Sequence, residues 1–247
     1  MNADTADQIR LLDVQALDVR LSQLAHKRAS LPEHAELDSL TKDLTQQRDL
    51  LVAAQTQEGD TAREQVKAEQ DVDQVRKRAV RDQERLDSGS VRSPKDLENL
   101  QRELTSLAKR QGDLEDIVLE VMERREATQE RVTALTERVA ALQAKSDDAK
   151  TRRDAATTEI DADAEAVAKD REVVVGSVPA DLIALYEKIR AKQNGIGAAK
   201  LYQRRCLGCQ LELDMAEINE IKAAPGNRVV RHDNCGRILV RTAESGI

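Results

Sequence analysis

The sequence predicts a mainly α protein, a long antiparallel coiled-coil hairpin with a small C-terminal β zinc ribbon. The chain contains 39 Lys and Arg and 46 Asp and Glu, but only two aromatic residues, both Tyr. A thick core filled with aromatic side chains is therefore excluded. Apolar residues recur every three and four positions along most of the chain. All three cysteines lie between Cys206 and Cys235, which places any site chemistry near the C-terminus.

The N-terminal half carries the apolar repeat in pieces. Spaced apolar residues run over 14–31, 37–51 and 68–86. Pro32 lies where the spacing between Leu31 and Leu37 is six rather than seven, and proline kinks or interrupts a helix. Gly59, in the polar stretch 55–63, is a second weak point. We interpret both as bends in one long element and not as domain boundaries.

The second half keeps the repeat without a slip from Leu97 to Val174. Of the 23 a and d positions over 97–174, 16 are Ala, Val, Ile or Leu. A 3.5-residue period sustained this long requires a supercoiled helical partner. The pattern predicts one helix of roughly 75–80 residues.

The segment 87–96 predicts the turn between the two halves. Gly89 suits a left-handed helix end, Ser93 suits an N-cap, and Pro94 suits the first helical position. A connection this short joins antiparallel neighbours. We therefore expect a hairpin over 1–175 with its turn near 88–93.

Folding about this turn pairs residue i with about residue 181 − i. The polar stretch 55–63 then faces 118–126, where Arg125 and Thr128 replace apolar residues in the seam. We expect a local bend or splay at this level.

Residues 176–197 predict a linker with a short helix. Gly176 to Pro179 ends the long helix, and an amphipathic segment follows with Leu182, Tyr186 and Ile189 on one face. A strand over 198–205 then leads into the cysteines, so the zinc-ribbon domain is expected over 198–247.

The metal-site prediction depends on two spaced pairs of donors. Cys206 and Cys209 form the first pair, and His232 and Cys235 form the second after 22 intervening residues. This is zinc-ribbon spacing, and Gly236 suits the positive φ of the second knuckle. We expect one structural Zn²⁺ per chain, bound by three cysteines and one histidine, in a module with little apolar core of its own. Unrelated free thiols and a Cys206–Cys209 redox pair are the alternatives.

The charge is divided unevenly along the chain. Residues 1–185 carry a net charge of −11, whereas residues 186–247 carry +4. Cations close to the knuckles are candidates for contacts with nucleic-acid phosphates. They are Lys188, Arg190, Lys192, Lys200, Arg204, Arg205, Arg228, Arg231, Arg237 and Arg241.

Other classes of function find little support in the sequence. No nucleophile–base arrangement or phosphate-binding Gly loop is present, so we expect a protein that is not an enzyme. His26 and His34 have no neighbours at ligand spacing and are expected to be solvated. No apolar run is long enough to cross a membrane, and the start MNADTADQIR is not a signal peptide, so a cytoplasmic location is expected.

Two segments carry a family resemblance. With SVRSPKDLENLQRE at the turn and CLGC followed by HDNCGRIL at the end, the chain resembles the bacterial C4-type zinc-ribbon domain proteins. The resemblance implies a zinc site of four cysteines, three of which match Cys206, Cys209 and Cys235, while His232 takes the fourth place. It also implies nucleic-acid binding, or an adaptor or chaperone role in flagellar gene control or secretion.

Two functions therefore stay open at this stage. The ribbon is expected to bind DNA or RNA, and the alternative is a protein adaptor that uses the hairpin, whose weakly packed middle would accept a partner helix. A purely structural spacer is a third possibility. The oligomeric state is left open by the sequence.

Overall fold

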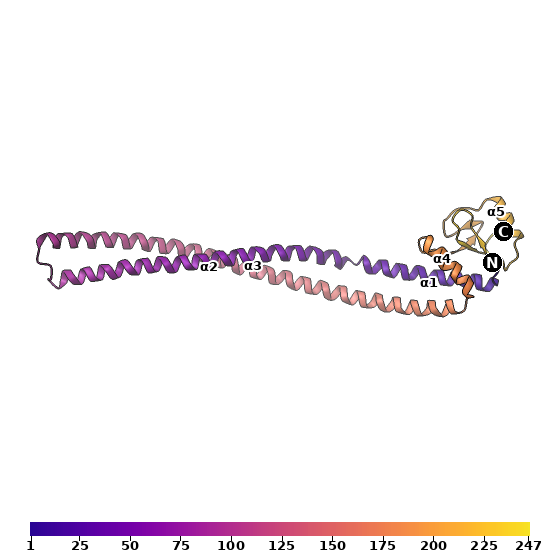
Figure 1. Cartoon of the computed structure of the whole chain (residues 1–247), viewed down its shortest axis with the longest axis horizontal. Coiled ribbons are helices and arrows are strands. Elements are labelled where there is room, and N and C mark those ends of the chain that lie inside the picture. The colour runs from indigo at the N-terminus through magenta and orange to yellow at the C-terminus, as the bar shows by residue number, and fades with distance from the viewer. The chain divides into compact units, whose positions relative to one another are not determined.

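The computed structural model describes all residues 1–247 and confirms the predicted fold class (Figure 1). Long helices form an antiparallel hairpin, and a small sheet occupies the C-terminal part. The chain forms two compact units, one of residues 1–34 and 150–247 and the other of residues 35–149. The elements are α1 (Thr5–Ala29), α2 (Pro32–Asp87), α3 (Pro94–Gly176), α4 (Ala180–Lys192), β1 (Ala198–Tyr202), β2 (Arg205–Cys206), α5 (Met215–Ala223), β3 (Val230–Arg231) and β4 (Ile238–Val240).

Pro32 interrupts the helix, which the spacing allowed, but the interpretation as a bend within one element is wrong, because two separate helices meet here and the two compact units divide at 34/35. Helix α1 ends at Ala29, and α2 begins at Pro32, where the missing N–H of proline costs no helical hydrogen bond. The Ser30 backbone N–H and hydroxyl both donate to the His26 carbonyl at the end of α1. Gly59, by contrast, lies inside an uninterrupted α2.

The turn between α2 and α3 uses the expected residues. Gly89 has a φ of 61°, which only glycine adopts readily, and Pro94 is the first residue of α3. The Ser93 carbonyl accepts the Leu97 backbone N–H, so Ser93 stands at the N-cap position. The turn is therefore built from local backbone preferences.

The unit of residues 35–149 is the part of the hairpin in which α2 and α3 lie side by side (Figure 1). Buried residues recur at heptad spacing on both helices, as the repeat predicted. On α2 they include Ala54, Thr61 and Ala68, and on α3 Leu114, Val121 and Thr128. No aromatic side chain interrupts this narrow seam.

The splay predicted at the polar level of the seam is wrong. Thr61 and Thr128 are both buried there, and their hydroxyls are hydrogen-bonded to each other at 3.3 Å. Each hydroxyl also bonds to a carbonyl in its own helix, so both buried hydroxyls are satisfied. Two threonines therefore complete the seam where apolar residues are absent.

The predicted register is also corrected by this contact. Both side chains are short, so their hydrogen bond shows that residues 61 and 128 lie at one level. Their numbers add to 189, not 181. The difference is about one heptad, or two helical turns, and it therefore leaves the same faces of both helices in the seam.

The other unit joins α1, α4 and the end of α3 to the C-terminal sheet. The sheet order is β2-β1-β4-β3, with β1 and β4 parallel and both outer pairings antiparallel. Asn2 pairs with Arg228 beyond this sheet, so the start of the chain extends it. One core cluster contains Leu11 of α1, Leu182 and Tyr186 of α4, and residues of β1 and β4.

The ribbon module, residues 198–247, has more apolar core than the sequence led us to expect. A second cluster of buried residues lies within it, and it includes two isoleucines of a helix, α5, that was not predicted. The members are Ala199, Leu201, Cys206, Leu213, Ile218, Ile221 and Leu239. The expectation of a module with little apolar core is therefore wrong.

Two buried polar residues of α1 bind elements of its unit together. The Asp18 carboxylate, whose side chain is 1% exposed, accepts hydrogen bonds from the Tyr186 hydroxyl at 2.6 Å and from Arg171 at 2.7 Å, and pairs with Arg190 at 3.1 Å. The Gln15 side-chain carbonyl accepts the Gly197 backbone N–H at 2.7 Å. Burial and the Asp18 carboxylate raise the pKa of the Tyr186 hydroxyl well above its ordinary value, so it stays a donor.

We expect Asp18→Ala to destabilise this unit by roughly 3–5 kcal/mol, because it leaves two guanidinium groups without their buried carboxylate. Asp13→Ala removes an exposed carboxylate from the same helix and is the control, with an expected change within about 0.5 kcal/mol. Urea unfolding followed by tyrosine fluorescence measures both. Equal midpoints for the two variants would show that the buried carboxylate does not stabilise the unit.

Candidate metal centre

The first knuckle follows the hairpin of β1 and β2. Leu201 pairs with Cys206 in this hairpin, which fixes Cys206 at the end of β2 with no exposed surface. The Gln210 backbone N–H then donates to the Cys206 carbonyl at 2.8 Å, and Gln210 has a φ of 65°. Gly208 inside the knuckle admits no side chain, because a Cβ there would lie 2.7 Å from Cδ of Arg237.

The second knuckle repeats this geometry between β3 and β4. The Gly236 backbone N–H donates to the His232 carbonyl at 2.7 Å, and Gly236 has a φ of 68°. The positive φ predicted for Gly236 is therefore confirmed. The residue after the last donor is left-handed in both knuckles, so the two turns present their donors in the same way.

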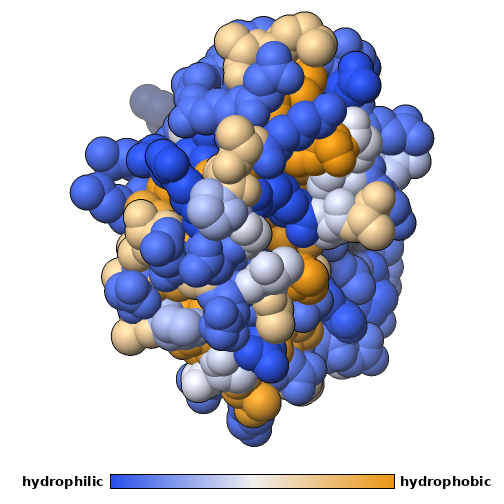
Figure 2. Space-filling view, turned by 90° about the vertical axis from the view of Figure 1, so that its right-hand side faces the viewer, coloured by the Kyte–Doolittle hydropathy of each residue, from blue (hydrophilic) through white to orange (hydrophobic).

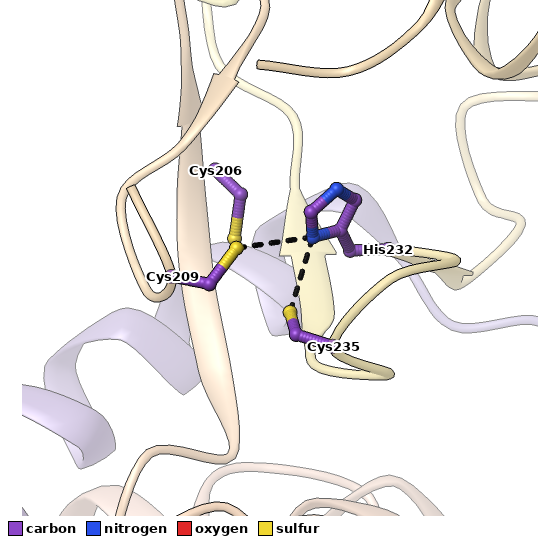
Figure 3. A group of neighbouring side chains, drawn as sticks. All are labelled: Cys206, Cys209, His232 and Cys235. Atoms are coloured by element: carbon purple, nitrogen blue, oxygen red, sulfur yellow. Dashed lines mark hydrogen bonds between the residues drawn. The ribbon is translucent and has the colours of Figure 1, made fainter. Parts of the chain in front are cut away.

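The two knuckles bring Cys206, Cys209, His232 and Cys235 together (Figure 3). Their donor atoms all lie within 4.8 Å of one another. Nδ1 of the His232 ring lies 3.3 Å from Sγ of Cys209 and 3.1 Å from Sγ of Cys235. A tetrahedral zinc site with Zn–S bonds of about 2.3 Å has S···S edges of roughly 3.8 Å and slightly shorter N···S edges, so these four donors fit Zn²⁺ once the two short contacts of the His232 ring lengthen slightly.

The protein environment acts differently on two of the thiols. Burial raises the pKa of Cys206 to about 12, against the opposing effect of backbone N–H groups of Cys209 and Gly208 that point at its sulfur. Burial also acts to raise the pKa of Cys235. Hydrogen bonds from the backbone and side chain of Arg237 and from His232 outweigh it and lower that pKa to about 7. Donors at the second knuckle thus favour the Cys235 thiolate, the form that binds metal, whereas burial outweighs the backbone N–H groups at Cys206 and keeps its pKa high.

Two of the ten predicted phosphate-binding cations support the ribbon from inside. Arg237 is buried and donates to the carbonyls of Ile196 and Gln193, both at 3.2 Å. Arg241 donates to five backbone carbonyls between residues 221 and 228. Both guanidinium groups are therefore used to hold loops in place.

Five more of these cations have partners within the protein. The pairs are Arg190 with Asp18 and Glu187, Lys200 with Glu244, Arg205 with Glu212, Arg204 with the Gly246 carbonyl, and Arg231 with the Gly236 carbonyl. Lys188, Lys192 and Arg228 are exposed and form no ion pair. The structure thus leaves three of the ten predicted cations without a partner.

Sequence reasoning missed two contributors to this region. Helix α5 lies between the knuckles, and its residue Glu217 is 7% exposed with a carboxylate oxygen 3.7 Å from Nε2 of His232. The sequence did contain a signal for this helix, because Asp214 is a favoured N-cap residue and apolar residues follow it at helical spacing. In the structure the Asp214 side chain accepts the Glu217 backbone N–H. The pairing of Asn2 with Arg228 had no comparable local signal.

Two domain patterns match the chain. The CT398-like coiled coil hairpin domain matches residues 14–194, and the C4-type zinc ribbon domain matches residues 205–239. The chain belongs to the CT398-like coiled-coil hairpin family. The family resemblance found in the sequence is confirmed, and the site differs from a four-cysteine ribbon at His232.

Members of this family and related structures cover nearly the whole chain. An uncharacterized protein of Mycobacterium tuberculosis is 36% identical over 241 residues, which span 98% of each chain. A solved structure from Mycobacterium smegmatis is 36% identical with a TM-score of 0.87 and covers 98% of this chain and 100% of its own. The solved structure of CT398 from Chlamydia trachomatis shares the fold, with a TM-score of 0.70. It is 16% identical, and the match covers 96% of this chain and 98% of that one. No helix of the present structure has both the length and the apolar character needed to span a membrane.

We expect the wild-type protein to carry about one zinc per chain and the Cys206→Ser/Cys209→Ser variant to carry none, because two of four donors are lost. Metal content is measured by mass spectrometry after exhaustive dialysis. His232→Asn is expected to weaken zinc retention, whereas His34→Asn, an exposed histidine outside the cluster, is the matched control. Zinc retained by the double cysteine variant would contradict the site.

Proposed function

We propose that this protein is a non-enzymatic, zinc-stabilised scaffold of the cytoplasm that binds a partner protein along its coiled-coil hairpin. The observation that carries the proposal is an open apolar groove on the hairpin. The zinc ribbon in this proposal is a structural module. Three free cysteines and no disulfide are consistent with a reducing compartment.

The donor set supports a structural and not a catalytic metal. Three thiolates and one imidazole fill a tetrahedron, so no position is left for the water that a catalytic zinc activates. Cys206 and His232 are buried, which also keeps substrate away from the centre. One Zn²⁺ per chain would hold the two knuckles together and so stabilise the ribbon module.

The groove lies between α2 and α3 in the unit of residues 35–149. It has a volume of about 370 Å³. Its lining residues are Glu69, Val72, Asp73, Arg76, Glu115, Val118 and Leu119. Leu119 is 58% exposed and forms one apolar edge of the groove.

Exposed apolar residues extend the groove along the hairpin. Met122 comes one helical turn after Leu119 on α3, and Val66 comes one turn before Glu69 on α2. Both are close to half exposed. The apolar surface is thus about two helical turns long, enough to contact neighbouring apolar side chains on one face of an amphipathic helix.

The ribbon end also has an apolar hollow, of about 400 Å³, which is lined by Leu12 and Val19 of α1 and by Leu207 of the first knuckle, among others. Figure 2 views the molecule from that side and shows apolar residues in small patches, separated by hydrophilic ones. Apolar residues scattered in this way are normal for a protein surface. The hairpin groove differs from the hollow at the ribbon end in its charged rim, which would select the kind of helix that binds there.

The charges around the groove favour one kind of occupant. The groove is lined by three carboxylates and one cation, so its net charge is negative: Glu69, Asp73, Glu115 and Arg76. The Arg76 guanidinium lies 3.2 Å from the Glu115 carboxylate. A second copy of this chain bound symmetrically would place these carboxylates against each other. We infer that the occupant is an amphipathic helix of another protein, with basic residues beside its apolar stripe.

Leu119→Asp is expected to weaken binding of such a helix at least tenfold, or by about 1.4 kcal/mol, because it places a charge in the apolar groove. The probe is a synthetic helical peptide with leucines at i, i+3, i+4 and i+7 and lysines beside them, followed by fluorescence anisotropy. Val52→Asp, at a similarly exposed valine of α2 outside the groove, is the control.

Three outcomes would overturn the inferred occupant. Unchanged peptide binding by Leu119→Asp would exclude the groove. Equal binding of a peptide whose lysines are replaced by glutamates would exclude the charge argument. A wild-type dimer that Leu119→Asp converts to a monomer, seen by analytical ultracentrifugation, would identify a second copy of this chain as the occupant.

Nucleic-acid binding is the second candidate function. It is favoured by Lys188, Lys192 and Arg228, the three exposed cations of the candidate set that have no acidic partner. Three phosphate contacts would give weak binding with little sequence preference. Tyr202, half-exposed beside Lys200, is the one ring available for base stacking, since Tyr186 is fully buried.

If this second function holds, Lys188→Glu/Lys192→Glu abolishes the mobility shift of mixed DNA and RNA at low salt. About three phosphate contacts on duplex DNA predict a roughly 40-fold loss of affinity between 50 and 200 mM salt. Lys42→Glu/Lys95→Glu, two exposed lysines in the other unit, is the control. Absence of any shift with zinc-loaded wild-type protein would eliminate this function.

A further inference from the structure

His232 is more deeply buried than a surface knuckle residue needs to be. Its side chain is 2% exposed, and Nδ1 faces the sulfurs of Cys209 and Cys235. If Nδ1 binds the metal, the proton of the neutral ring is on Nε2. A buried ring N–H requires an acceptor, and without one it would lower the stability of the loaded site.

Glu217 of α5 is the group that faces this proton. Its Oε2 lies 3.7 Å from Nε2 of His232, slightly longer than a hydrogen bond, and both side chains are buried. The separation exceeds the usual N–H···O distance by about half an ångström, which a small rotation of either side chain would close.

The second knuckle holds the Glu217 side chain in this orientation, and the helix cap holds its backbone. Its Oε1 accepts the Asp233 backbone N–H at 2.9 Å, which ties it to the second knuckle itself. Its own backbone N–H donates to the Asp214 carboxylate at 2.8 Å, so its place in the first turn of α5 is fixed. The carboxylate is therefore preorganised toward His232 and is not a flexible surface group.

The charge balance gives this carboxylate a further role. Zn²⁺ bound by four thiolates has a net charge of −2, whereas three thiolates and a neutral imidazole give only −1. A buried carboxylate beside the imidazole restores −2 within the same volume. It also increases the electron donation of the bound nitrogen, as carboxylates do in carboxylate–histidine–zinc arrangements.

We propose that Glu217 is a positioning residue that fixes the tautomer and orientation of His232 and so lets a histidine replace the fourth cysteine of the ribbon. The proposal rests on the metal site of the proposed function. It assigns to α5 a role in metal binding beyond its two buried isoleucines.

The test is a double-mutant cycle of Glu217→Gln and His232→Cys, read as zinc affinity by competition with a chromophoric chelator. In the wild-type background, Glu217→Gln is expected to weaken zinc binding 10- to 100-fold, the usual effect of losing such a partner. In the His232→Cys background the same change is expected to alter affinity less than about threefold, because no imidazole is left to orient. Glu220→Gln, an exposed glutamate of the same helix, is the control and is expected to have no effect.

A second readout keeps the proposal testable if His232→Cys fails to fold. Nitrogen-15 NMR of the zinc-loaded wild-type protein is expected to show His232 with its proton on Nε2, and Glu217→Gln is expected to shift that resonance. Equal losses of affinity in both backgrounds would mean that Glu217 only supports the knuckle through Asp233, and would overturn the proposal. Unchanged affinity in the wild-type background would do the same. Failure of the wild-type protein to bind zinc would instead overturn the metal site, and with it this proposal.

Discussion

The unit that contains the ribbon depends on the buried carboxylate of Asp18. Two guanidinium groups and one phenol converge on it from α3 and α4, and a lone carboxylate in this position would be strongly unfavourable without them. Its neighbour Gln15 bonds the backbone just before β1. One face of α1 therefore determines how α3, α4 and the sheet come together. The first strand leads directly into Cys206, so the placement of the metal donors follows from this polar contact as well as from the knuckles.

The heptad repeat was sufficient to predict the hairpin, but it could not determine the register. A shift of one heptad returns every apolar residue to the seam, so alternatives separated by seven residues have the same pattern. The contact that distinguishes them is between Thr61 and Thr128, two residues that the sequence presented as defects. Their hydroxyls are satisfied by each other and by their own helices, which is a property of the pair and cannot be inferred from either residue alone.

The metal donors could be predicted because their spacing is local to each knuckle, whereas their surroundings could not. Spacing placed Cys206, Cys209, His232 and Cys235 in one cluster. Glu217 lies 15 residues before His232 and reaches it only because α5 packs over the second cluster of core residues. The capping pattern at Asp214 would have predicted the helix but not its direction. A contact between a helix and a knuckle depends on packing, for which a linear pattern carries no information.

The sequence also could not show which basic residues are free to bind phosphate, because that depends on their contacts in the folded protein. The strands of the ribbon contain two to five residues, so they satisfy few of the backbone carbonyls around them. Buried carbonyls require donors, and arginine supplies several on one planar group. Arg237 and Arg241 fill this need, and their positive charge is then directed at the protein's own backbone. Counting cations near a zinc knuckle therefore overestimates the charge available to phosphate. In a module with strands this short, an arginine close to the donors in the chain is as well suited to holding loops as to binding a polyanion.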